Sequence, residues 1–76
     1  MKYKAIEVNA TIEIDGNVEV CSVHDKPTMF SVYGRKEVDD LAEWHSDHRS
    51  RESAVETARM ISQNMCIPLW DFTEGR

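Results

Sequence analysis

The sequence contains no apolar run that approaches the roughly 20 residues a helix needs to cross a bilayer. Its first ten residues, MKYKAIEVNA, lack the hydrophobic segment of a signal peptide and carry Glu7. Cysteine is scarce too, because Cys21 and Cys66 are too few for a disulfide framework. These absences predict a cytoplasmic protein with reduced thiols and no membrane partner.

Glycine and basic residues are also sparse. The three glycines are Gly16, Gly34 and Gly75, so no glycine-rich loop is available to cradle a phosphate. Lys and Arg number 9 against 14 Asp and Glu, which gives a net charge of −5. Nonspecific phosphate binding depends on clustered Lys and Arg, so nucleic acid is an unfavoured partner and a basic protein is a compatible one.

Side chains for catalysis or metal binding form no strong motif. No nucleophile signature surrounds either cysteine, and a free Cys usually packs as a small hydrophobe. The spacings that suggest zinc are Cys21-x-x-His24 and His45-x-x-His48, although residues three apart share a face only on a helix. We expect a non-enzymatic protein without cofactor or metal, and leave open whether these four side chains ever hold an ion.

What the chain does have is enough apolar content for a fold. Its 76 residues are 41% hydrophobic, which favours a folded chain over a disordered one despite 30% charged residues. This length predicts a single small domain, 1–76, whose thin core buries about 60% of the unfolded surface.

Residues 6–14 alternate between apolar and polar side chains, which indicates a strand with one buried face. A two-residue loop at 15–16 would pair Ile12 with Glu19 and mix the two faces of a hairpin. A three-residue loop that includes Asn17 keeps apolar partners together and places Glu13 opposite Glu19. We favour the longer loop, since the facing glutamates cost only a few tenths of a kcal/mol in water.

A third strand is predicted over 28–36, with Phe30 and Val32 on one face and Met29, Ser31 and Tyr33 on the other. Residues 37–48 fit either a strand or a helix. As a strand, which we favour, they place Trp44 on one side. The other side then carries Glu43, His45 and Asp47.

A helix is predicted over 51–64, because apolar side chains recur there at helical spacing and Ser50 is suited to cap its first turn. Pro68 prevents continuation and leaves an extended tail. The fold class is therefore α+β: an antiparallel three- to four-stranded β-meander with one C-terminal helix packed on its apolar face. Trp44, Trp70 and Phe72 are expected to help close the core.

Three segments, FSVYGR, EWHSDHRSRESAVETA and IPLWDF, resemble small proteins of phages and mobile elements over residues 29–72. In those proteins a strand ending in Asp precedes a Ser/Thr-Arg-Glu helix start, although an aromatic often stands where this chain has His48. The resemblance implies a mobile-element origin and location in the host bacterial cytoplasm. Such small acidic proteins include antagonists of host defence, anti-CRISPR proteins among them, and the resemblance implies no catalytic residues.

The leading functional hypothesis is an inhibitor that occludes a basic, nucleic-acid-binding surface of a host protein. Rows of carboxylates on a rigid sheet attract basic grooves. The predicted partner-binding residues are the acidic ones on the wet face, namely Glu7, Glu13, Glu19, Glu43 and Asp47. The alternatives are a nucleic-acid module using Arg35, Lys36, Arg49 and Arg51, and a homodimer joined through the Met29/Tyr33 side.

Overall fold

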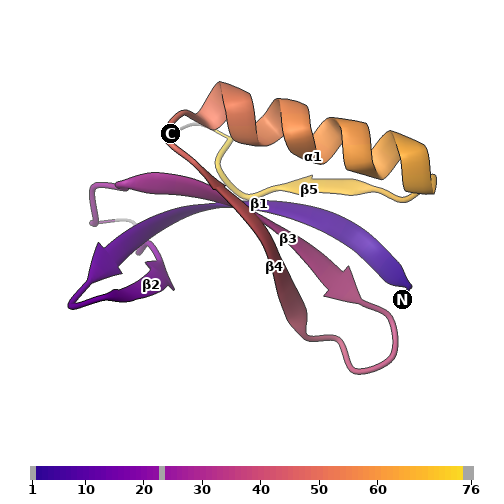
Figure 1. Cartoon of the computed structure of the whole chain (residues 1–76), viewed down its shortest axis with the longest axis horizontal. Helices are drawn as coiled ribbons and strands as arrows, with labels where there is room; N and C mark the ends of the chain where they lie inside the picture. Colours follow the sequence, from indigo (N-terminus) through magenta and orange to yellow (C-terminus); the bar gives the residue numbers. More distant parts are fainter. Residues whose placement is uncertain (1, 23, 75–76) are drawn as a thin grey trace.

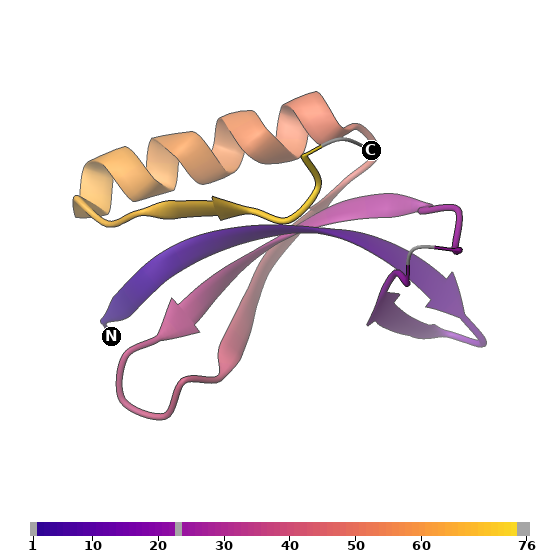
Figure 2. The same cartoon turned by 180° about the vertical axis from the view of Figure 1, so that it is seen from behind.

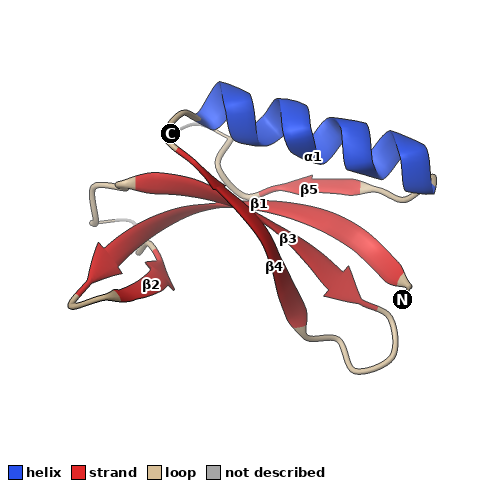
Figure 3. Ribbon diagram, in the orientation of Figure 1, coloured by secondary structure: helices blue, strands red, loops and turns tan. Residues whose placement is uncertain are grey.

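The computed structural model describes residues 2–22 and 24–74. Five strands and one helix follow in the order β1 (Tyr3–Ile14), β2 (Asn17–Val20), β3 (Met29–Lys36), β4 (Ala42–His48), α1 (Arg51–Met65) and β5 (Leu69–Asp71). The strands form one twisted layer and the helix lies against one side of it (Figures 1 and 3). This arrangement confirms the predicted α+β class.

The sheet is built around β1, the longest strand. Its order is β2-β1-β3-β4, with all three of these contacts antiparallel. The short β5 pairs with β1 in parallel over Ile6–Val8 and was not predicted as a strand. Figure 2 shows from behind that α1 and β5 lie on the same side of β1.

The core lies between α1 and the even-numbered face of β1, as the alternation predicts. Ile6, Val8 and Val32 are buried there against Ala54 and Ala58 of the helix. Because both helix residues are alanines, the helix backbone can approach the sheet closely. Ser50 caps the helix by accepting a 3.1 Å hydrogen bond from the Ser53 N–H, as expected.

The β1–β2 turn corrects the predicted register. The loop has two residues, and Ile12 pairs with Glu19 while Glu13 pairs with Val18. Asp15 and Gly16 both have positive φ, 51° and 83°, which is the backbone of a type I′ turn. The register was predicted on the assumption that Val18 and Val20 are buried. That assumption was wrong, because β2 lies beyond the helix and Val20 is 59% exposed.

Two β-bulges shift which side chains share a face. One falls between Tyr3 and Ala5 against β3, and the other places His45 as the extra residue of β4 between Trp44 and Ser46. The strand over Ala42–His48 confirms the favoured reading of 37–48, yet the bulge ends the simple alternation within it. Tyr3 is consequently turned to the helix side, where its ring contacts Gly34 and packs against the core.

Candidate protein-binding face

The sheet face opposite the helix carries a row of side chains that crosses four strands. Trp70 of β5 pairs with Glu7 of β1, Glu7 pairs with Tyr33 of β3, and Tyr33 pairs with Trp44 of β4. Directly paired residues project from the same side of a sheet. The four therefore form one cross-strand row on this side, which we call the open face because α1, the one helix among the described residues, packs on the opposite side (Figure 1).

Three of the four members of this row are aromatic and solvent reaches them. Trp44 is 59% exposed, Trp70 is 37% exposed and Tyr33 is half-buried. The expectation that Trp44, Trp70 and Phe72 close the core was therefore wrong. The core cluster holds Leu69 instead, and strand alternation turns its neighbour Trp70 outward.

Glu7, the fourth member, lies between Trp70 and Tyr33 in this row and is only 2% exposed. Arg35 binds it at two points, with Nε 2.5 Å from Oε2 and Nη2 2.9 Å from Oε1. This bidentate geometry is the strongest form of a carboxylate–guanidinium contact. The hydrogen bonds to Glu7 raise the pKa of Arg35.

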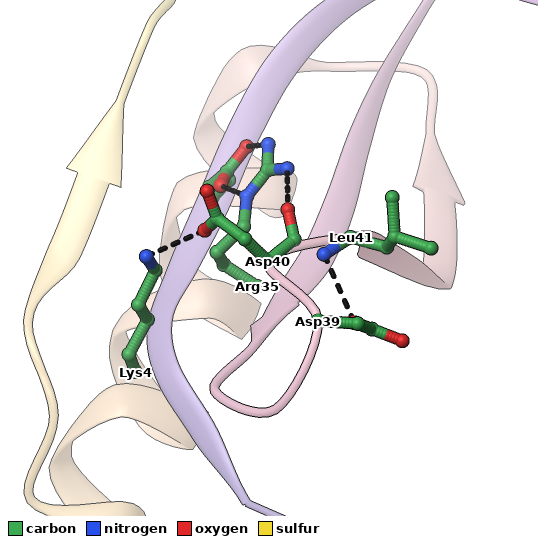
Figure 4. A network of polar contacts seen from close by, with 6 residues as sticks. Lys4, Arg35, Asp39, Asp40 and Leu41 are labelled. Carbon is green, nitrogen blue, oxygen red and sulfur yellow. Dashed lines mark hydrogen bonds and ion pairs between the residues drawn. The ribbon is translucent and has the colours of Figure 1, made fainter.

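The loop between β3 and β4 extends this network (Figure 4). Arg35 Nη1 donates to the Asp40 carbonyl at 2.8 Å, and Lys4 Nζ lies 2.5 Å from Asp40 Oδ1. Asp39 accepts from the Leu41 N–H at 3.1 Å. The Leu41 hydrogen bond lowers the pKa of Asp39, and the Lys4 hydrogen bond lowers that of Asp40. Arg35 and Lys4 are thus each paired with a carboxylate at this end of the face.

A second polar chain supports the middle of the open face. Ser31 Oγ donates to Asp47 Oδ1 at 2.5 Å, so the 2.8 Å contact between Thr11 and Ser31 has Thr11 as the donor. Trp44 Nε1 donates to the same Asp47 oxygen at 3.0 Å and its indole is thereby oriented. Burial raises the pKa of the Tyr33 phenol beside this chain, with a further contribution from the Asp47 charge.

Apolar side chains surround the row. Val18 and Val20 pair with odd-numbered residues of β1 and so project from the open face. Met29 pairs with Thr11 on this side. Phe72 stacks edge-on against Trp70, with ring centroids 6.5 Å apart, and is itself 59% exposed. Aromatic residues, Met and Arg are the residue types enriched in protein–protein interfaces.

At one end the open face is hollowed. The hollow has a volume of about 460 Å³ and lies between the end of β1, the segment before β3 and the end of β4. Its lining residues are Glu13, Thr28, Met29, Asp47, His48 and Arg49. Asp47 belongs both to this hollow and to the polar chain that orients Trp44.

The predicted acidic row on β1 and β2 does not exist. Glu7 is buried in its ion pair, while Glu13 and Glu19 project from opposite faces because each pairs with a residue of opposite parity. Glu13 stays on the open face. Glu19 lies on the helix side of the sheet, beyond the end of the helix.

The predicted row of Glu43 with Asp47 is wrong for a different reason. The bulge at His45 reverses the parity between them, so Glu43 pairs with Gly34 on the helix side and Asp47 pairs with Ser31 on the open face. There Glu43 accepts a hydrogen bond from the Tyr3 hydroxyl. Of the five predicted partner-binding carboxylates, Glu13 and Asp47 remain exposed on one face.

The four basic residues of the nucleic-acid alternative do not gather. Phe30 of β3 pairs with His48, the residue before Arg49. Arg35 lies five residues farther along β3, about 17 Å from Phe30. Lys36 is paired with Asp39 at 3.1 Å, and Arg51 with Asp71 at 2.6 Å. Arg49 lies at the far end, in the hollow.

The histidines form a hydrogen-bonded series with serines. Ser46 Oγ lies 2.9 Å from His45 Nδ1 and 2.8 Å from His48 Nε2, and His48 Nδ1 lies 2.8 Å from Ser53 Oγ. The bulge thus brings both rings to one hydroxyl, although a regular strand would separate them. Within residues 2–22 and 24–74, no three His, Cys, Asp or Glu side chains converge as metal ligands. Neither Cys21 nor Cys66 forms a disulfide bond among the described residues.

No helix among the described residues is long and apolar enough to cross a membrane. Comparisons with protein-family models, curated proteins and solved structures found no significant match to this chain.

Proposed function

We propose that this chain is a non-enzymatic protein-binding module that acts through its open face. The observation that carries the proposal is the cross-strand row of Trp70, Tyr33 and Trp44, which also contains the buried Glu7. Exposed aromatic rings held on a rigid sheet offer contact area at a low cost in conformational entropy. The bidentate Glu7–Arg35 pair fixes the backbone beneath them.

The predicted role, inhibition of a basic host protein by a phage or mobile-element product, remains part of this proposal. The surface assigned to that role changes, because the acidic row of Glu7, Glu13 and Glu19 is replaced by the aromatic row with two exposed carboxylates at one end. A mobile-element origin, an anti-CRISPR-like activity and a location in the host bacterial cytoplasm stay predictions based on the resemblance.

Self-association is the second candidate, and the position of Met29 and Tyr33 on the open face favours it. A homodimer would bury the same rings that a foreign partner would cover. Light scattering over a concentration series distinguishes the two, since a monomer at high concentration excludes the homodimer.

The test of the proposal is partner capture with a matched pair of variants. Trp44→Ser combined with Trp70→Ser removes two rings of the row, whereas Met60→Ser removes an equally exposed apolar side chain from the helix. We expect the wild type and Met60→Ser to retain the same protein from a bacterial lysate and the double variant to lose it. Circular dichroism verifies that all three chains fold, and retention by the double variant contradicts the proposal.

A further inference from the structure

The open face has an uneven charge distribution that points to the chemistry of its occupant. At its β3–β4 loop end, Arg35 is matched by Glu7 and Lys4 is matched by Asp40. At the other end, Glu13 has no ion pair with a described residue, and both bonds to Asp47 reach Oδ1, leaving Oδ2 without a donor among residues 2–22 and 24–74.

The two carboxylates line the hollow next to an aromatic ring. Asp47 Oδ1 accepts from Trp44 Nε1 at 3.0 Å, so the indole lies beside the hollow that Glu13 and Asp47 share. Arg49 also lines the hollow and partly offsets their charge. Two carboxylates against one arginine leave it negative, in a chain whose net charge is already −5.

Building on the proposed function, we infer that the occupant of the open face is a protein segment that inserts an arginine side chain into this hollow. A guanidinium is planar, so it can donate to the free oxygen of Asp47 and stack on the Trp44 ring at the same time. Apolar neighbours of that arginine would cover Met29 and Tyr33. A second copy of this chain fits less well, because it would bring like charges together.

The inference is tested with two synthetic peptides of equal length, one alternating valine with arginine and the other alternating valine with citrulline. Citrulline has nearly the same shape as arginine without the charge. Binding is followed by the nuclear magnetic resonance shift of the Trp44 indole N–H. We expect the arginine peptide to shift this resonance, with an affinity that falls as salt rises, and the citrulline peptide to leave it in place.

Matched variants separate the hollow from the general acidity of the chain. Asp47→Asn and Glu13→Gln should each weaken the arginine peptide about tenfold, because each removes a charge-assisted contact. Glu56→Gln makes the same charge change on the exposed side of the helix and should have no effect. Circular dichroism of Asp47→Asn controls for loss of the Ser31 and Trp44 contacts.

The remaining outcomes overturn the inference. Equal binding of the two peptides at the Trp44 resonance would mean that the face selects apolar contact and not charge, which leaves the proposed function intact. Binding that Glu56→Gln weakens as much as Asp47→Asn would show a nonspecific charge effect. A dimer that Trp44→Ser dissociates would exclude an arginine segment, and so would the absence of a shift with either peptide. In both cases the lysate capture tests the proposed function independently.

Discussion

Glu7 of β1 and Arg35 of β3 are diagonal neighbours, joined by two hydrogen bonds on the side of the sheet that the helix leaves uncovered. The side chain of Glu7 is 3% exposed and that of Arg35 is 28% exposed. A buried carboxylate is tolerated only with such a partner, since its desolvation is otherwise uncompensated. The ion pair therefore allows Glu7 to be buried although it projects from the open face of β1.

The first prediction concerns removal of one half of this pair. Arg35→Met leaves the Glu7 carboxylate buried without its partner, and we expect the free energy of unfolding to fall by about 3 kcal/mol. The double variant Glu7→Leu with Arg35→Met should recover most of that loss, because it also removes the buried charge. Urea unfolding of the two single variants and the double variant measures the coupling energy. If the losses simply add, the pair does not act as a unit.

The second prediction concerns the turn that corrected the register. Gly16 has φ of +83°, a conformation in which an L side chain costs about 1–2 kcal/mol. Gly16→Ala should therefore lower the melting temperature by at least about 4 °C for a domain of this size. Asp15→Asn should raise it slightly, because Asn at this place in a type I′ turn is preferred.

A contrary result would be informative about the register. In the three-residue loop expected from hydrophobic pairing, Glu13 and Glu19 would face each other, and Glu19→Lys would stabilise the hairpin. In the observed register Glu19 pairs with Ile12, so this substitution should leave stability nearly unchanged. Clear stabilisation by Glu19→Lys would contradict the two-residue turn.

The sequence pattern predicted the features of the fold that depend on the local periodicity of apolar residues. The buried face of β1, the faces of β3, the strand over Ala42–His48 and the capped helix all follow from repeats of two or of 3.6 residues. The bulge at His45 does not, because one inserted residue reverses parity without changing the composition of the strand. That single residue separated Glu43 from Asp47.

Tertiary contacts determined the other features that the sequence did not predict. β5 is only three residues long and depends on Arg51, which bonds Asp71 at 2.6 Å and Thr73 at 2.9 Å. The turn over 15–16 was predicted wrongly because the sequence does not show how far the helix extends over the sheet. That extent decides whether Val18 and Val20 are buried. The observed helix leaves β2 exposed, so turn chemistry, and not burial, sets the register there.

The third prediction concerns the end of the helix. Cys66 stands at the C-cap with φ of 56°, and the Ile67 N–H bonds the Ser62 carbonyl at 3.0 Å, as in a Schellman motif. Glycine adopts this conformation without the steric cost that a side chain carries. Cys66→Gly should therefore raise the free energy of unfolding by up to about 1 kcal/mol. Cys66→Ala is the control, since it removes the thiol and keeps the strain, and it should show no such gain.

The last prediction concerns Tyr3, whose ring lies over Gly34 and whose hydroxyl donates to Glu43. The hydrogen bond to Glu43 raises the pKa of Tyr3 above 10, with burial adding to the effect. Since the folded chain favours the protonated phenol, this contribution to stability is present below pH 10 and is lost as the pH rises through the folded pKa. Tyrosinate absorbance against pH should show both tyrosines titrating late, because the pKa of Tyr33 is raised too.

Two substitutions should bring Tyr3 back toward its ordinary pKa and leave Tyr33 displaced. Glu43→Gln removes the charged acceptor. Gly34→Ala acts indirectly, because a Cβ there would lie 2.6 Å from the Tyr3 ring and must push it away from Glu43. Tyr3→Phe identifies which titration step belongs to Tyr3. Stability lost in Gly34→Ala should be partly restored by adding Tyr3→Ala, since the clash is then relieved. A late Tyr3 step that survives Glu43→Gln would show that burial, and not this hydrogen bond, controls its pKa.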